Sequence, residues 1–399
     1  MRILLVHPYL VIQGQTVRSY PVEPLGLLYI ATYLIQEAKK EGVPVEGNIL
    51  DAHLQGTEGV TPTALGYRSG MTDQQLSVYF KNYNPDIIGI SNNYTSGTRS
   101  VLDLAAVAKQ DCPSAVLILG GAHATLDHEN LIRIPEVNVV VRGEGEITFK
   151  ELVFALSRKE SLDGVLGITY RNKDGIHVNA PRPFVENLDE LPIPDRSLIA
   201  YHDYLGKEIY VYTKNKPVGT IFTSRGCPFR CIFCSTQKTW GNHWRGRSPE
   251  NMLKEAEYLR NTYGVREIAF QDDQLLGDPQ RMIEFCKLVV RRKLNLTFIA
   301  PPGNSPARMS TELLDWMARA GFYRLCFSVD VGTEKAAKYV KKPVMLKKIR
   351  PLVKYANARG IWTYGTFVIG FPNENQQDVL ETIRYAHSLR LDFVRFYVA

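Results

Sequence analysis

No stretch of this sequence approaches the roughly 18 consecutive apolar residues that a membrane-spanning helix needs. Residues 1–10 are apolar, but they carry no signal-peptide cleavage pattern and are more typical of a first strand. There is also no low-complexity tract, and the composition, 45% hydrophobic and 22% charged, is that of a globular protein. We therefore expect no membrane span, and 399 residues suit two domains better than one.

Cysteine is scarce and unevenly spread. Only six cysteines occur, and three of them, Cys227, Cys231 and Cys234, fall within eight positions. The other three are scattered: Cys112, Cys286 and Cys326. In a chain without a secretion signal this pattern favours a metal site in a reducing compartment, the cytoplasm, over a disulfide framework.

Long runs of one charge are missing as well. The formal net charge is +7, but the densest basic runs, residues 291–293, 341–342 and 347–348, are short. Such runs are more typical of solvated faces than of a nucleic-acid surface, so we expect no nucleic-acid partner.

The first half of the chain alternates short apolar strands with helices. A helical pattern covers Pro24–Lys40. The strands are rich in Val, Ile and Leu and are predicted at Ile3–His7, Val45–Leu50, Asp86–Ser91, Ala115–Leu119 and Val137–Val141. Continuous apolar strands of this kind indicate a parallel sheet covered on both faces. The sequence thus predicts a doubly wound, Rossmann-like α/β domain over residues 1–160.

A second alternation begins near Gly219. Before it, residues 164–181 predict a hairpin, and Leu188–Arg196 has the prolines of an interdomain linker, which gives a hairpin-and-linker region at 161–205. Six strands are predicted at Thr220–Ser224, Glu267–Phe270, Leu296–Ala300, Tyr323–Asp330, Trp362–Ile369 and Phe393–Val398. Residues 206–399 are therefore expected to form a partial, TIM-like (β/α)6 barrel, with its active site at the carboxyl ends of the strands. The chain stops on the sixth strand, which leaves open a region beyond it.

The cysteine cluster has the spacing C-x3-C-x2-C and follows the first predicted barrel strand. Thiolates suit iron–sulfur clusters, and three of them leave one iron of a four-iron cluster open to a small molecule. A structural zinc site formed with His243 is the alternative, although zinc ligands usually come in paired short spacings.

This segment resembles the radical S-adenosylmethionine (SAM) superfamily, whose signature is C-x3-C-x2-C with an aromatic residue, here Phe233, before the last cysteine. The resemblance implies that Cys227, Cys231 and Cys234 hold a [4Fe–4S] cluster. It further implies that SAM binds the open iron and is cleaved to methionine and a 5′-deoxyadenosyl radical, with Phe233 near the adenine.

Three further barrel segments fit the resemblance. Family members place a polar motif, often two glycines and an acid, after the second strand against the SAM amino group. Here that place holds Gln271, Asp272 and Asp273, and which of them binds stays open. The fourth strand carries Ser328 and Asp330, which the resemblance places near the SAM carboxylate or ribose. The segment 365–372 after the fifth strand, with Gly370, is similar to the part that closes over adenine.

The N-terminal half resembles the cobalamin-binding domain of the cobalamin-dependent radical SAM group. The matching residues follow predicted strand ends, and they are Pro8, Tyr9, Ser91, Asn92, Gly120, Gly121, Ala122, His123, Gly143, Glu144 and Gly145. Glycines remove side chains, so a bulky ligand can approach the backbone there. Asp51–Gly56 also matches D-x-H-x-x-G, whose histidine ligates cobalt elsewhere. Because it follows the second strand rather than the first, we expect His53 not to be a cobalt ligand.

The resemblance implies a cobalamin- and SAM-dependent radical enzyme with cobalamin between its two domains. The most common activity of the group is methylation of an unactivated carbon, or of phosphorus, in a small-molecule substrate, with an external flavodoxin- or ferredoxin-like electron donor. A cobalamin-dependent cyclase or ring-rearranging enzyme is the alternative within catalysis, and a cobalamin-binding sensor is the alternative outside it. For the substrate, the sequence offers candidate contacts only. Tyr364, Tyr323, Arg395 and Tyr397 are candidate contacts.

Overall fold

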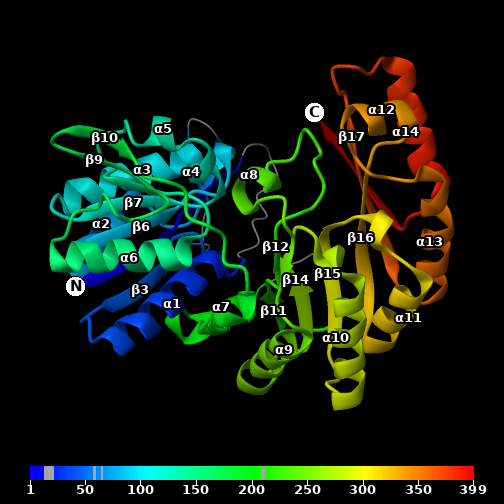
Figure 1. Cartoon of the computed structure of the whole chain (residues 1–399), viewed down its shortest axis with the longest axis horizontal. Coiled ribbons are helices and arrows are strands. Elements are labelled where there is room, and N and C mark those ends of the chain that lie inside the picture. The colour runs from blue at the N-terminus through cyan, green and yellow to red at the C-terminus, as the bar shows by residue number, and fades with distance from the viewer. Residues whose placement is uncertain (13–21, 57–59, 64–65, 206, 208–211) are drawn as a thin grey trace. The chain divides into compact units, whose positions relative to one another are not determined.

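The computed structural model describes residues 1–12, 22–56, 60–63, 66–205, 207 and 212–399. It divides into two compact units, Met1–Val185 with Leu191–Tyr210 and Glu186–Glu190 with Val211–Ala399 (Figure 1). Each unit is built around its own parallel sheet, and each is described below by itself.

A seven-stranded sheet in the order β10-β9-β8-β7-β6-β1-β3 forms the centre of the first unit. Its strands are β1 (Arg2–His7), β3 (Glu46–Asp51), β6 (Ile87–Ser91), β7 (Val116–Gly120), β8 (Val139–Val141), β9 (Ile168–Asn172) and β10 (Gly175–Val178). The first five are parallel, and the hairpin β9–β10 adds an antiparallel edge. Because β1 lies between β3 and β6, the order reverses there, and ligands of such sheets bind outside the carboxyl ends of the strands at this point.

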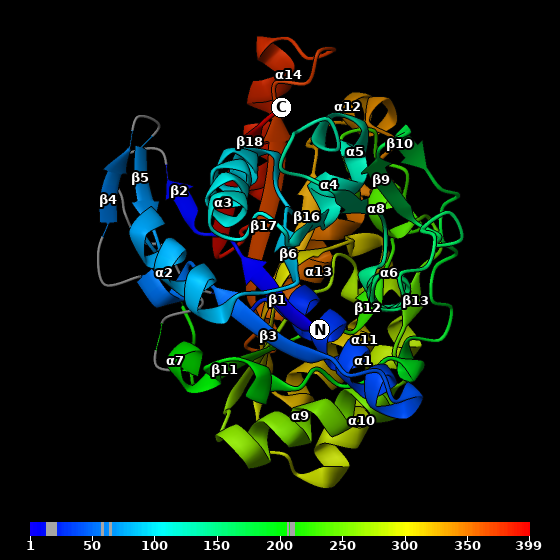
Figure 2. The same cartoon turned by 90° about the vertical axis from the view of Figure 1, so that its left-hand side faces the viewer.

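Helices cover both faces of this sheet (Figure 2). On one face α1 (Leu25–Glu41) and α6 (Gly145–Arg158) bury an apolar core that includes Leu28 and Leu152. On the other face α2 (Asp73–Tyr83) and α3 (Thr98–Asp111) bury Phe80 and Leu104. Short helices α4 (Ala122–Leu126), α5 (His128–Leu131) and α7 (Tyr201–Leu205) complete the list of α-helices in the described part of this unit. The doubly wound Rossmann-like fold predicted from the strand pattern is confirmed.

Local sequence signals account for the helix ends. α1 ends at Gly42, whose φ of 67° is left-handed, and two lysines in its last turn complement the helix dipole. α2 begins with a capping box in which the Thr72 side chain accepts from the Gln75 N–H and Gln75 reaches back to Thr72.

A small antiparallel sheet, β2 (Leu10–Ile12), β5 (Gly66–Ser69) and β4 (Val60–Thr63), was not among the predicted elements. It packs beyond the carboxyl end of β1. β4 and β5 are four residues long and mix polar with apolar residues, so they lack the continuous apolar run by which the other strands were predicted.

The second unit holds six parallel strands in the order β11-β14-β15-β16-β17-β18, which is the open (β/α)6 barrel predicted. The strands are β11 (Val218–Ile221), β14 (Glu267–Phe270), β15 (Thr297–Asn304), β16 (Phe322–Asp330), β17 (Trp362–Ile369) and β18 (Phe393–Val398). The helices are α8 (Thr236–Trp240), α9 (Pro249–Tyr263), α10 (Pro279–Arg292), α11 (Thr311–Ala320), α12 (Glu334–Tyr339), α13 (Leu346–Ala358) and α14 (Gln376–Ser388).

The first barrel strand lies earlier than predicted. β11 ends at Ile221, and Ser224–Arg225 forms β12, which pairs with β13 (Arg245–Gly246) in a separate two-stranded ribbon. The cysteine segment therefore follows this ribbon and not the barrel strand itself. Residues 218–224 are apolar or small throughout, so the division of this stretch depends on tertiary partners that the sequence pattern does not reveal.

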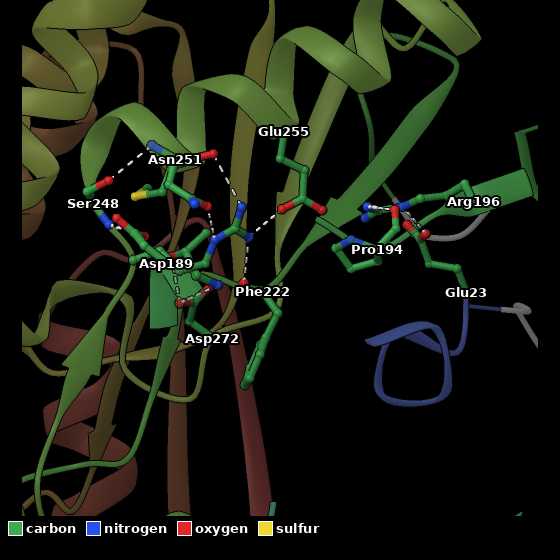
Figure 3. Close-up of polar contacts among 12 residues, drawn as sticks. Glu23, Asp189, Pro194, Arg196, Phe222, Ser248, Asn251, Glu255 and Asp272 are labelled. Carbon is green, nitrogen blue, oxygen red and sulfur yellow. Dashed lines mark hydrogen bonds and ion pairs between the residues drawn. The ribbon is translucent and has the colours of Figure 1, made fainter. Parts of the chain in front are cut away.

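The predicted linker around Leu188–Arg196 is a packed segment. Arg196 is fully buried, donates to the Glu23 carboxylate at 3.1 Å and to the Pro194 carbonyl at 3.0 Å, and so fixes the segment beside the start of α1 (Figure 3). An arginine without solvent contact is retained only when such partners satisfy it.

Candidate functional site

The three clustered cysteines lie on one loop of the second unit, directly after β12. The Cys234 N–H donates to the Cys231 carbonyl at 3.1 Å, which makes the end of the loop a tight turn. At its start Gly226 has a φ of 82°, and a Cβ there would lie 2.2 Å from the His243 carbonyl oxygen. Only glycine fits this position, so the backbone geometry explains why glycine directly precedes Cys227.

All three thiols are free, and Cys234 lies close enough to influence the pKa of both Cys227 and Cys231. Burial raises the pKa of Cys231 to about 11 and raises the pKa of Cys227 above its ordinary value. The positive charge of Lys342 acts in the opposite direction on both. Burial that penalises thiolates is offset when a metal binds them, because coordination replaces the lost solvation.

A buried carboxylate holds the segment that leads into this loop. Asp272, at the end of β14, accepts from the Thr223 N–H at 3.1 Å, the Thr223 hydroxyl at 2.7 Å and the Ser224 hydroxyl at 2.5 Å. Arg281, also buried, donates to the Thr223 carbonyl at 3.1 Å. Burial raises the pKa of Asp272, and the charge of Arg281 opposes that rise.

A second buried pair supports the same segment. Arg247 contacts Glu255 on α9, and its guanidinium also donates to the Phe222 carbonyl at 3.1 Å and to the Asn251 side chain at 2.7 Å (Figure 3). The neighbouring Ser248 N–H donates to Asp189 at 2.9 Å. Residues 222–224 are thus held by charged groups from the segment before α9, from α10 and from the end of β14.

The polar motif after β14 is divided by this arrangement. The Asp272 side chain points inward and serves the cysteine loop, whereas Asp273 is exposed to solvent and Gln271 is half-buried. Although Asp273 keeps contact with solvent, the surrounding protein removes part of the hydration of its carboxyl, and this desolvation, followed by repulsion from Asp272, raises its pKa to about 6. Asp273 also influences the pKa of Cys227, so it lies on the same side of the barrel as the cysteines.

Two more predicted segments meet at these strand ends. The Phe233 ring lies 5.6 Å, centroid to centroid, from that of Phe371, which follows Gly370 after β17. At the end of β16, the Ser328 hydroxyl donates to the Asp330 carboxylate at 2.8 Å. The cysteine loop after β12 therefore lies at the same edge of the barrel as Asp273 after β14, Asp330 at the end of β16 and Gly370 after β17.

His243 does not complete a zinc site with the cysteines. Its side chain is 76% exposed, and its ring nitrogen lies 3.9 Å from the Glu186 carboxylate. Among the described residues, no group of three or more His, Cys, Asp or Glu is arranged to hold a single ion. A four-iron cluster meets each thiolate through a different iron, so its ligands need not converge on one point.

Comparison with known proteins now identifies both units. A family model of the radical SAM superfamily matches residues 221–386, and a model of the B12 binding domain matches residues 16–153. The chain is 31% identical to the uncharacterized methyltransferase PH0819 of Pyrococcus horikoshii, over all of this chain and 80% of the relative. It belongs to the cobalamin-dependent radical SAM enzymes.

Other similarities agree with this family. The enzyme is 30% identical to the cytidylyl-2-hydroxyethylphosphonate methyltransferase of Streptomyces wedmorensis over 94% of this chain and 75% of that protein. The methyltransferase TsrM of Kitasatospora setae, solved with cobalamin and a [4Fe–4S] cluster, has the same fold, with a TM-score of 0.79, 18% identity, and coverage of 100% and 74%. A more distant relative is the anaerobic magnesium-protoporphyrin IX monomethyl ester cyclase of Synechocystis, 25% identical over 96% and 72%.

The resemblance noted in the sequence is thus confirmed, as are the enzyme class and the three cofactors: a [4Fe–4S] cluster, SAM and cobalamin. Within the described ranges, no helix combines the length and apolarity needed to cross a membrane.

At the strand ends of the first unit of this radical SAM enzyme, two glycines have open space where a side chain would lie. Gly143 has a φ of 74°, and a Cβ there would meet nothing within 4 Å. A Cβ on Gly120 would meet only Val141, at 3.8 Å. Pro8 and Ala122 are half-buried at the ends of β1 and β7. These positions fit a ligand that approaches the backbone.

Other residues predicted at this edge serve the fold of the unit. Tyr9 is buried, and the Arg68 guanidinium covers its ring at 3.5 Å. Asn92 is 1% exposed, and its carbonyl accepts from the His123 and Ala124 N–H groups. A Cβ on Gly121 would lie 2.5 Å from the Asn93 side-chain oxygen. The packing of neighbouring loops therefore explains why these residue types occur at these positions, whether or not they also contact a ligand.

The same holds for the acid and glycine after β8 and for the buried serine after β6. Glu144 is buried and accepts from the Val185 N–H at 2.7 Å. A Cβ on Gly145 would lie 2.7 Å from the Ile30 side chain on α1. Ser91 is 9% exposed at the last position of β6.

Two histidines of this unit, His123 and His53, are engaged or enclosed. His123 has one ring nitrogen 3.0 Å from the Thr95 hydroxyl and the other 3.8 Å from the Asp127 carboxylate. His53 is 2% exposed, and burial lowers its pKa to about 4. Asp51 accepts from the His53 and Leu54 N–H groups, both at 2.9 Å, and from the Tyr204 hydroxyl. The D-x-H-x-x-G match is therefore explained by a turn after β3.

Proposed function

We propose that this enzyme transfers a methyl group from SAM, through cobalamin, to an unactivated carbon or to phosphorus of a small molecule. The observation that carries the proposal is the loop of three free cysteines at the edge where Asp273, Asp330 and Gly370 also lie. Two relatives that are at least 30% identical over most of their length are named as methyltransferases.

We assign the cluster to Cys227, Cys231 and Cys234. When bound, the cluster supplies the electron that cleaves SAM, and cobalamin supplies the methyl group. The protein holds the cysteine loop rigid through the buried charges of Asp272, Arg281 and Arg247. Fixed geometry matters here because the radical must abstract the target hydrogen before it reacts with any other group.

For SAM, Asp273 is the best-suited acid of the polar motif. Its carboxylate is accessible, whereas both Thr223 and Ser224 already donate to Asp272. A carboxylate at a strand end can accept charge-assisted hydrogen bonds from the SAM ammonium. Phe233, with Phe371 and Gly370, offers an apolar face for the adenine ring.

For cobalamin, we assign the contacts of the first unit to the strand-end backbone at Pro8, Gly120, Ala122 and Gly143. These residues carry small side chains or none, so the backbone and the shape of the edge would do most of the binding. Neither His123 nor His53 is assigned to cobalt, because both ring nitrogens of His123 have neighbours and His53 is enclosed.

For the substrate, Arg395 with Tyr397 and Tyr364 is the strongest candidate among the residues considered. Arg395 lies beside Thr366 in the β17–β18 register, donates to the Tyr397 hydroxyl at 3.4 Å, and covers the Tyr364 ring at 5.7 Å. A guanidinium suits a carboxylate, phosphate or phosphonate group. Tyr323 is excluded from this role because its hydroxyl donates to the buried Glu267.

We further propose that a flavodoxin- or ferredoxin-like protein reduces the cluster, in the reducing environment of the cytoplasm. Support comes from the six free cysteines, four of which, Cys112, Cys231, Cys286 and Cys326, are buried without forming disulfides.

The test is isotope tracing with methyl-labelled SAM on anaerobically reconstituted enzyme that holds cobalamin. Candidate substrates are screened for stimulated release of 5′-deoxyadenosine, and the product of each is analysed for the label. We expect the label in the product. A product formed without it would favour the cyclase alternative, which the cyclase relative supports. An enzyme that binds cobalamin but never cleaves SAM would favour a sensor.

A further inference from the structure

Lys342 belongs to a basic pair that the sequence indicated to be a solvated face. The structure divides the pair: Lys341 is exposed, but the Lys342 side chain is 7% exposed. Its ammonium donates to the Asp330 carboxylate at 2.6 Å and to the Ser328 hydroxyl at 3.1 Å. A buried lysine is costly unless it is paired, and here it is paired at a strand end that faces the candidate site.

Asp330 is held in an unusual state. Its φ of 62° is left-handed, which is strained for a residue with a side chain. Besides Lys342, its carboxylate accepts from the Ser328 hydroxyl at 2.8 Å and from the Thr366 hydroxyl at 2.9 Å. Four side chains from β16, β17 and the turn after α12 therefore form one closed network.

This network is tied to the cysteine loop. The Ile232 N–H, between Cys231 and Cys234, donates to the Val340 carbonyl at 3.1 Å, and Val340 ends α12 two residues before Lys342. Of the charged groups that shift the pKa of Cys231, Lys342 has the largest effect and lowers it, whereas Asp330 raises it. The ion pair and the cysteine loop thus lie side by side.

We propose that Lys342 is a positioning residue of the cluster site, which fixes Asp330 and Ser328 at the end of β16 and places a positive charge beside the cluster. The inference rests on the assignment of the cluster to the three cysteines. Reduction adds an electron to a cluster with three thiolate ligands, so a neighbouring cation favours the reduced form and a neighbouring anion disfavours it.

The experiment compares the reduction potential and the iron and sulfide content of the reconstituted full chain with Lys342→Met, Asp330→Asn and both together. Lys341→Met is the matched control, because it removes the same charge one residue away from an exposed side chain. Lys342→Met leaves Asp330 without its counter-charge, so we expect about tenfold less reduced cluster at a fixed potential, a shift of about 59 mV to the negative for one electron.

The other variants separate charge from structure. Asp330→Asn leaves the lysine charge and should shift the potential to the positive. The double variant removes both charges and should return close to wild type. If Lys342→Met is too unstable to take up a cluster, the other two variants still test the proposal. Asp330→Asn should then shift the reduction potential to the positive, and the double variant should have a potential close to that of wild type.

Loss of cluster with shifts of the same sign in both single variants, or a Lys342→Met potential equal to that of Lys341→Met, would overturn the role of Lys342. Both results leave the cysteine assignment standing. A wild-type chain that incorporates no cluster would instead overturn the cysteine assignment, and the role of Lys342 with it.

Discussion

Replacing Arg247 by Met should destabilise the second unit by about 3–5 kcal/mol. The Arg247 and Glu255 side chains are 4% and 0% exposed, so the substitution leaves the Glu255 carboxylate buried without this counter-charge. It also removes the hydrogen bonds that Arg247 donates to the Phe222 carbonyl and the Asn251 side chain. Methionine keeps most of the apolar stem, so lost volume contributes little.

Urea unfolding followed by tryptophan fluorescence measures this effect selectively. The chain has four tryptophans, Trp240, Trp244, Trp316 and Trp362, and all lie in the second unit. The double variant Arg247→Met/Glu255→Leu should regain most of the loss, because an apolar pair can replace a buried ion pair at little cost. Lys287→Met, which removes an exposed pair with Glu284, is the control and should change the free energy of unfolding by less than about 1 kcal/mol.

The reasoning predicts that the unstable single variant also loads less iron, since Arg247 holds residue 222 just ahead of the cysteine loop. An unfolding free energy of Arg247→Met within about 0.5 kcal/mol of wild type would refute the view that this pair supports the loop.

Three further predictions follow from individual residues. Asp273→Asn should weaken SAM binding by about tenfold. The wild-type affinity for SAM should rise with pH around 6, where the Asp273 carboxyl ionises, and the variant should lack this rise. Isothermal titration calorimetry from pH 5 to 8 measures both effects. In the folded protein His53 stays neutral down to about pH 4, whereas in the unfolded chain it protonates near pH 6.5. Its contribution to stability, about 3 kcal/mol, is therefore complete above pH 6.5 and is lost as the pH falls toward 4. His53→Gln should flatten the pH dependence of urea unfolding between these two values. Gly120→Val should lower cobalamin affinity at least about tenfold without changing the free energy of unfolding. Gly164→Val, at an exposed glycine with similarly open surroundings, is the control and should change neither quantity. If equilibrium dialysis gave wild type and Gly120→Val the same cobalamin affinity, Gly120 would not belong to the cobalamin site.

The sequence allowed the two folds to be predicted because both are built from apolar parallel strands of three to nine residues, whose composition differs sharply from the helices between them. The cysteine triplet was equally accessible, since three ligands on one short loop need no knowledge of tertiary structure. The first barrel strand was misplaced because residues 218–224 are uniformly apolar or small, and only the pairing of β12 with β13 divides them.

The supporting residues of the site could not be predicted in the same way. Nothing in the Lys341-Lys342 pair tells which lysine is buried, because that depends on Asp330, 12 residues away, and on the strained turn after β16. Asp272 and Asp273 are adjacent and chemically identical, yet one is enclosed by residues 223–224 and the other faces solvent. Tyr9 matched the family pattern, but Arg68, 59 residues later, covers its ring.

The central claim is that Cys227, Cys231 and Cys234 hold the cluster that cleaves SAM. Its most direct test is the iron and sulfide content of anaerobically reconstituted protein, measured together with the 5′-deoxyadenosine formed after reduction. We predict about four iron and four sulfide per chain for wild type and for a Cys112→Ala/Cys286→Ala/Cys326→Ala variant, with loss of both cluster and cleavage when any one of the clustered cysteines is replaced by Ala. Retention of a full cluster and of SAM cleavage in Cys231→Ala would contradict the account.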